Sequence, residues 1–323
     1  MILPATYDGI HTAASLIQMG EVVAFPTETV YGLGADALSE RAVEKIYALK
    51  GRPRVNPLIV HLLSIDSLDS VAIIPTSGQR AIWFASLTTL WPGPLTIVLP
   101  KHNVVPDITS GGLGTVGVRI PSHPVAREFL SACGIPVAAP SANRSLGVSP
   151  TNASHVSDEF GEQLPILDGG ASIVGLESTI ISLASDTPRI LRHGAFSAEY
   201  LAQLLDLPLE SLLYDGQDIL APGMMRRHYS PRTPVILKEN FDPSNPSAKV
   251  GFIGFSPEGR PPFPFSANLV LSPSGDLAEV ASQLFSALRE QDKLGLDLIV
   301  VDSCPEFGIG RAIMDRLTRA TAT

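Results

Sequence analysis

Short apolar runs rich in valine and isoleucine alternate along this chain with longer amphipathic segments. The runs have the length and composition of strands, and the amphipathic segments have the periodicity of helices. Many boundaries between them carry a proline or a glycine, of which the chain has 28 and 27. Elements that alternate in this way bury their apolar faces as a sheet covered by helices. The sequence therefore predicts an α/β fold.

The predicted elements form two groups, which define a first domain at 1–205, a linker at 206–232 and a second domain at 233–323. The second group predicts a small α/β layer of Rossmann-like pattern. Strands are predicted at 21–25, 57–63, 95–99, 116–120, 135–139, 166–167, 179–183 and 189–191, and then at 235–237, 249–255, 268–271 and 298–302. Helices are predicted at 9–19, 40–49, 76–90 and 125–132, and then at 277–288 and 309–318.

Composition narrows the class of protein. The chain has 323 residues, of which 45% are hydrophobic and 17% charged, so it can bury a sizeable core. A net charge of −9 disfavours general nucleic-acid binding, which depends on phosphate neutralisation. With two cysteines, a disulfide scaffold or a cysteine zinc site is excluded, and a reducing cytoplasm is expected. We find no signal peptide and no apolar run long enough to span a bilayer.

Common catalytic motifs do not identify a reaction class for this chain. Gly112-Leu-Gly114-Thr-Val-Gly117 matches the dinucleotide pattern literally, but it enters a predicted strand and not a helix. No P-loop, zinc-protease motif or nucleophile elbow is present in the sequence. Nucleotide chemistry, if present, must therefore use other groups.

One loop concentrates positive charge. Lys50, Arg52 and Arg54 lie within five residues, interrupted by a glycine and a proline. A rigid cationic loop suits a polyphosphate, with arginine giving bidentate contacts and lysine a point charge. The alternative is a solvated surface loop.

Two further residues are unusual for the strands that hold them. Arg119 falls in an apolar strand, where it must pair with a carboxylate of the protein or of a ligand. His61 falls in another, where a satisfied core histidine is the more common explanation.

Polar clusters follow several predicted strands at the end where open α/β sheets bind ligands. They begin at Thr27, at Ser141 and at Glu177. Ser149 followed by Pro150 also predicts a helix start, whose free N–H groups would favour an anion.

Taken together, these clusters resemble the threonylcarbamoyl-AMP synthases, the YrdC-like enzymes, in their long form with an extra C-terminal domain. The resemblance rests on eight segments in the family's order: FPTETVYGLG, KGRPRVNPLIVH, WPGPLT, VGVRIPSHP, PSAN, SPT, GLESTI and HYSP. It implies a YrdC-like twisted open mixed sheet with helices, plus a small Rossmann-like C-terminal α/β domain. It also implies a nucleotidyltransferase that joins L-threonine, bicarbonate and ATP into threonylcarbamoyl-adenylate for tRNA modification.

The resemblance assigns roles to particular residues. The catalytic signature is Lys50, Arg52, Ser141 and Asn143. The L-threonine site comprises Thr27, His61, Arg119 and either Ser178 or Thr179, with Arg119 on the carboxylate. The ATP side adds Asn56, Thr115, Ser149 and Arg192, and the linker residues His228 and Tyr229 form a gate.

The same reasoning predicts cofactor and partners. We expect Mg²⁺ with ATP, held by phosphate oxygens and water, because no carboxylate cage is evident. The resemblance implies transfer of the product to a tRNA threonylcarbamoyl transferase complex, with no membrane and no stable nucleic-acid binding. An RNA-binding or regulatory protein on the same fold is the alternative. Met225 and Arg226 depart from the family's usual linker sequence.

Overall fold

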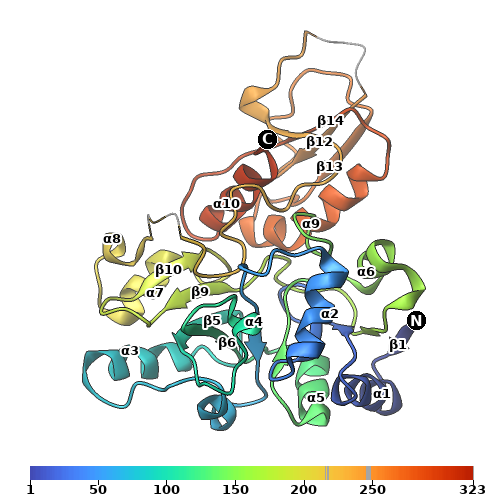
Figure 1. Ribbon diagram of the computed structural model, residues 1–323. Coiled ribbons are helices and arrows are strands. Elements are labelled where there is room, and N and C mark those ends of the chain that lie inside the picture. Colours follow the sequence, from blue (N-terminus) through green and yellow to red (C-terminus); the bar gives the residue numbers. More distant parts are fainter. Residues whose placement is uncertain (215, 217, 245–248, 323) are drawn as a thin grey trace.

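A computed structural model describes residues 1–214, 216, 218–244 and 249–322 and contains two sheets (Figure 1). The larger has ten strands in the order β1-β8-β2-β3-β7-β4-β6-β5-β9-β10. These are β1 (Ile2–Pro4), β2 (Val23–Phe25), β3 (Gly32–Asp36), β4 (Ile59–His61), β5 (Leu95–Pro100), β6 (Thr115–Arg119), β7 (Val137–Ala138), β8 (Ile166–Asp168), β9 (Thr179–Ser182) and β10 (Arg189–Arg192).

Parallel and antiparallel neighbours are mixed in this sheet. Strand β4 pairs parallel with β6 and antiparallel with β7, while β5 pairs antiparallel with β6 and parallel with β9. The register sets His61 beside Arg119. The predicted mixed sheet is confirmed.

Helices cover both faces of the large sheet, and β2 shows why. Val23 and Phe25 belong to one apolar cluster with α1 and α5, whereas Ala24 belongs to a second cluster with α2 and α3. Alternate residues of a strand point to opposite faces, so a strand that is apolar throughout needs cover on both. The helices are α1 (Tyr7–Gln18), α2 (Glu40–Lys50), α3 (Gly78–Thr88), α4 (Asp107–Ser110), α5 (Pro124–Cys133), α6 (Ala153–Phe160), α7 (Ala198–Leu205) and α8 (Leu209–Leu212).

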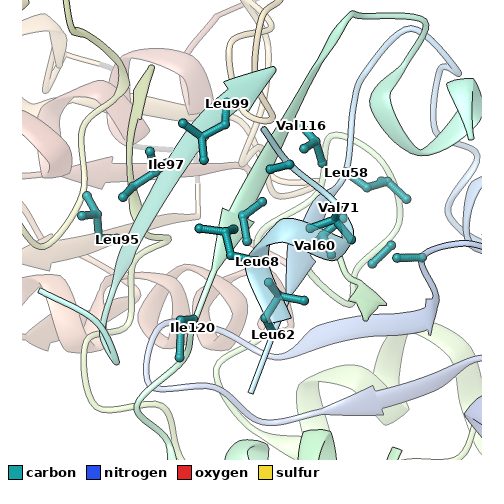
Figure 2. Packing of buried hydrophobic residues seen from close by; sticks show 14 of the residues in the cluster. Leu58, Val60, Leu62, Leu68, Val71, Leu95, Ile97, Leu99, Val116 and Ile120 are labelled. Carbon is teal, nitrogen blue, oxygen red and sulfur yellow. The ribbon is translucent and has the colours of Figure 1, made fainter. Parts of the chain in front are cut away.

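The second apolar cluster forms the main core of the first domain. Figure 2 shows part of this cluster, with Val60 of β4, Ile97 and Leu99 of β5, and Leu68 of the short helical turn at Ile65–Ser70. All four side chains are fully buried.

The smaller sheet is parallel, with order β11-β14-β12-β13, and is formed by β11 (Val235–Leu237), β12 (Val250–Gly254), β13 (Ala267–Val270) and β14 (Leu298–Val301). In Figure 1, α9 (Leu277–Asp292) and α10 (Gly310–Ala320) lie between this sheet and the first domain. Its core also includes Val30, Val148 and Leu176 of the first domain, so the two halves share one apolar interior. The Rossmann-like layer is confirmed.

Some predicted elements differ from the structure. The helix expected to start at Ser149 is capped instead by Asn152, whose side chain accepts from His155 N, and it begins at Ala153. Strand β3 has no counterpart among the predicted strands. A Cβ at Gly34 would lie 2.9 Å from the Phe25 ring, so this position has room only for glycine. Because glycine is not typical of strands, the sequence pattern gives no strand signal here.

Within the described residues, the helices are all too short or too polar to cross a membrane. The linker prediction of 206–232 and the two domain boundaries stay predictions.

Candidate active site

A cavity of about 40 Å³ lies where the strand ends of the large sheet meet the linker. Nine of the residues assigned to the site from the sequence line it, from both halves of the first domain and from the linker. They are Thr27, Arg52, His61, Arg119, Ser141, Ser178, Arg192, His228 and Tyr229. Three arginines around so small a space make it a site for an anionic ligand.

Arg119 ends β6 and is almost fully buried. Its guanidinium forms a 2.8 Å ion pair with Glu28 and donates to Thr29 Oγ1 at 2.8 Å. Burial raises the pKa of Glu28, but the charge of Arg119, its hydrogen bond and backbone hydrogen bonds together leave that pKa below its ordinary value. Of the two partners that the sequence left open, the one seen here is a carboxylate of the protein itself, whereas the family resemblance implied the carboxylate of threonine.

Arg52 is held by the loop that follows it. It donates to the Asn56 backbone oxygen at 3.0 Å, to Asn56 Oδ1 at 2.7 Å and to the Pro57 oxygen at 2.8 Å. Burial lowers the pKa of Arg52 to about 10, so the group stays charged at neutral pH. Asn56 thus positions this guanidinium instead of lining the cavity.

Lys50 closes α2 and organises a neighbouring loop. Its Nζ donates to the Ser141 oxygen at 2.6 Å and to the Asn143 oxygen. The Asn143 amide in turn donates to the Gly147 oxygen at 2.9 Å. Burial lowers the pKa of Lys50 well below its ordinary value, and Arg52 lowers it further. Lys50 and Asn143 therefore shape the loop that presents Ser141.

The structure separates Ser178 from Thr179. Ser178 Oγ lies 2.8 Å from Thr96 Oγ1 and accepts from Arg192 at 3.1 Å, and it faces the cavity. Thr179 Oγ1 donates to the Phe196 oxygen at 2.8 Å and points away. Thr115 lies outside the cavity as well, since it begins β6 while Arg119 ends it.

Sequence reasoning gave no role to Glu28 or Glu177, although both line or flank the site. Ser149 Oγ donates to Glu177 Oε1 at 2.5 Å, so Ser149 fixes a carboxylate instead of capping a helix. Burial raises the pKa of Glu177, yet Arg316, Arg192 and the hydrogen bond from Ser149 together hold the pKa below its ordinary value. The available signal was a carboxylate beside hydroxyl residues next to a predicted strand, where a buried carboxylate needs a partner.

The linker forms one wall. Pro222, Gly223, His228 and Tyr229 line the cavity, and Tyr229 has a φ of 60° with its ring buried. A left-handed backbone conformation is unusual for tyrosine and persists only where the surrounding packing fixes it.

Two neutral histidines make stability depend on pH. Burial lowers the pKa of His61 to about 3 and that of His228 to about 3, from an ordinary 6.5. Because the unfolded rings bind protons below pH 6.5 and the folded rings do not, acidification favours unfolding. We expect the free energy of unfolding to fall by up to about 1.4 kcal/mol per pH unit for each ring as pH drops from about 6.5 towards 3.

Urea unfolding at pH 7 and pH 5 tests this dependence. His61→Gln should lose part of the difference between the two pH values. An identical difference in the wild type and in His61→Gln would contradict the assignment.

No group of three or more histidine, cysteine, aspartate or glutamate side chains that could hold a metal ion is found in the part of the chain that is described. The two carboxylates at the cavity, Glu28 and Glu177, already face arginines. This donor set fits an ion that arrives with its own phosphate ligands better than one held by the protein alone.

The fold and the site together define an α/β protein whose cation-lined cavity is closed by a linker leading to a second domain. A family described as telomere recombination matches residues 15–194, and a threonylcarbamoyl-AMP synthase C-terminal domain matches residues 196–322. The threonylcarbamoyl-AMP synthase of Pyrococcus abyssi is 40% identical over 324 residues, which cover 97% of this chain and 94% of the relative. That of Bacillus subtilis is 37% identical, covering 96% and 92%.

A solved structure agrees with these relatives. The crystal structure of Pyrococcus abyssi Sua5 complexed with L-threonine superposes with a TM-score of 0.88 at 37% identity, covering 99% of this chain and 97% of that one. This chain belongs to the threonylcarbamoyl-AMP synthase family, and the resemblance noted from its motifs is confirmed.

Proposed function

We propose that this chain is a nucleotidyltransferase that makes L-threonylcarbamoyl-adenylate and pyrophosphate from L-threonine, bicarbonate and ATP. The observation that carries the proposal is the cavity ringed by Arg52, Arg119 and Arg192 in a chain that matches named synthases over nearly its whole length. Its product would serve threonylcarbamoyladenosine formation on tRNA.

The chemistry needs no covalent enzyme intermediate. The threonine amine adds to the carbon of bicarbonate, water leaves, and a carbamate results. A carbamate oxygen then forms a bond to the α-phosphorus of ATP while the bond to the β-phosphate oxygen breaks and pyrophosphate departs. Such a displacement depends on positioning and on stabilising charge on the phosphates.

We assign different residues of the cavity to the two substrates. Arg52 and Arg192, with Ser141 on the loop held by Lys50, form the side that we assign to the phosphates. Thr27, His61, Arg119 and Ser178 line the same cavity, and we assign these residues to threonine. If the threonine carboxylate takes Arg119, then Glu28 must share that guanidinium, which has donors enough for both.

The closed linker explains the small cavity. About 40 Å³ is far below the roughly 300 Å³ or more of ordinary ligand pockets, so the wall that includes His228 and Tyr229 must open for ATP. Once closed again, it would keep water from an adenylate that hydrolyses easily.

We propose Mg²⁺ as the ion bound with ATP, supplying charge neutralisation on the phosphates. Hydroxyls such as that of Ser141 could reach it, while phosphate oxygens and water would complete its shell. Transfer of the product to a tRNA threonylcarbamoyl transferase complex and a cytoplasmic location stay predictions.

Pyrophosphate release tests the proposal. Purified protein with ATP, Mg²⁺ and bicarbonate should release pyrophosphate with L-threonine and far less with L-serine. ATP binding without threonine-dependent release would contradict it and would favour the regulatory or RNA-binding alternative.

A further inference from the structure

Helix α10 of the second domain sends one arginine into the first domain. Arg316 is the largest of the fully buried side chains, at 1% exposure. Its Nε donates to Glu177 Oε2 at 2.8 Å, and its Nη2 donates to the His193 oxygen at 2.9 Å. Both partners belong to the first domain, so this guanidinium crosses the boundary between the domains.

Glu177 connects that contact to the cavity. The carboxylate lines the cavity wall, and its two oxygens are used by different parts of the chain. Oε2 accepts from Arg316, while Oε1 accepts from Ser149 at 2.5 Å. With both oxygens engaged, the orientation of this cavity carboxylate depends on a residue of the second domain.

Tyr229 provides a second connection. The Arg316 guanidinium lies 5.0 Å from the centre of the Tyr229 ring, and Phe285 of α9 stacks with the ring at 5.5 Å. Tyr229 lines the cavity in a left-handed backbone conformation that costs energy unless its surroundings fix it. Those surroundings come from α9 and α10.

The neighbouring residue on the next turn of α10 acts on the same linker. Arg319 Nη1 donates to the Met225 oxygen at 2.6 Å, and its own backbone oxygen accepts from His228 N at 3.2 Å. Asp315 pairs with both arginines, at 2.6 and 2.9 Å. One face of α10 therefore holds the linker wall and the Glu177 carboxylate together.

We propose that Arg316 is a positioning residue of the active site, which aligns Glu177 and Tyr229 and thereby makes the second domain a working part of the catalytic cavity. The proposal rests on the proposed synthase function and adds to it a role for the second domain. Stability alone is a poor explanation for the pair, because removing two charges from water offsets most of what their attraction provides.

The same helix offers a matched comparison. Arg311 of α10 also forms an ion pair with a first-domain glutamate, Glu199, at 3.1 Å. Both side chains are 22% exposed, and neither lines the cavity. Arg311→Gln thus removes an interdomain ion pair of the same chemistry that does not touch the site.

The test compares the wild type, Arg316→Gln, Arg316→Lys and Arg311→Gln by threonine-dependent pyrophosphate release, with the unfolding midpoint of each. We expect Arg316→Gln to lower kcat/KM about 100-fold, as a small misplacement in a cavity does, and Arg311→Gln to stay near the wild type. Arg316→Lys should recover part of the loss, since it keeps the charge but not the planar fork.

A double-mutant cycle with Glu177→Gln separates positioning from mere stability. If Arg316 acts through Glu177, adding Arg316→Gln to Glu177→Gln should cost little more than Glu177→Gln alone. Losses that multiply, or losses that follow the folded fraction alone, would overturn the proposal. The neutral double variant also avoids the buried unpaired carboxylate that could stop Arg316→Gln from folding.

Wild-type turnover and the variant ratios answer different questions. A wild type without threonine-dependent turnover contradicts the proposed function. An active wild type with an equally active Arg316→Gln contradicts only the inference. Calorimetric binding of ATP gives the inference its own readout, with about tenfold weaker binding expected for Arg316→Gln and unchanged binding for Arg311→Gln. Equal ATP affinity in both variants would overturn it.

Discussion

Arg52→Gln is expected to lower kcat/KM for pyrophosphate release about 100- to 1,000-fold. The guanidinium is fixed by hydrogen bonds to Asn56 and Pro57, so on the proposed function it would stabilise developing phosphate charge without having to reorganise. Glutamine keeps a polar side chain but removes the charge.

Arg54→Gln is the matched control for this prediction. Arg54 lies two residues away on the same loop, its side chain is 71% exposed, and it pairs with Glu44 at the surface. We expect its removal to leave kcat/KM within about twofold of the wild type, because exposed ion pairs contribute little. A comparable loss in both variants would mean that the loop, and not the buried charge of Arg52, limits the reaction.

Arg119→Met is expected to be the most destabilising of the site substitutions. It leaves Glu28 buried without its cation, and breaking one partner of a buried pair costs about 3–5 kcal/mol of unfolding free energy. Denaturant unfolding at neutral pH measures the loss.

The double variant Arg119→Met, Glu28→Gln identifies the cause. It should recover most of the unfolding free energy, since no uncompensated charge remains, but it should not recover threonine-dependent turnover. A single variant that unfolds like the wild type would show that the carboxylate finds another partner and that the ion pair is not the determinant of this strand end.

The second domain packs against residues around the site, in a contact that a one-domain chain lacks. Apolar residues of the first domain and linker, Val30, Leu176 and Tyr229 among them, pack in the same cluster as Phe285 and Leu317 of α9 and α10. On the proposed function, opening the linker wall for ATP would disturb contacts made by α10, including that of Arg319 with the Met225 oxygen. Substrate entry would then depend on how the second domain is docked.

The strands were the most predictable part of the fold. Runs such as 95–99 and 298–302 are mostly apolar and rich in β-branched residues, and the structure has β5 and β14 there. Strand β3 was missed because Gly32 and Gly34 carry no strand signal of their own, and their role appears only when Phe25 packs against them.

The sequence motifs predicted which residues belong to the site, but not which residues contact one another. The sequence indicated that Lys50, Ser149 and Arg119 matter, yet their partners lie about 90, 28 and 91 positions away. Nothing local in the chain says that Ser149 meets Glu177 or that Arg119 meets Glu28, because those contacts arise from strand order. The contact of Arg316 with the site could not be predicted either, because the sequence of its helix has an ordinary amphipathic pattern.

The most direct measurement is the identity of the product. Incubation with ATP, Mg²⁺, L-threonine and ¹³C-bicarbonate, followed by rapid mass spectrometry, should show one species that contains AMP, threonine and a single labelled carbon. Formation of AMP and pyrophosphate without that species, or with an unlabelled one, would contradict the account.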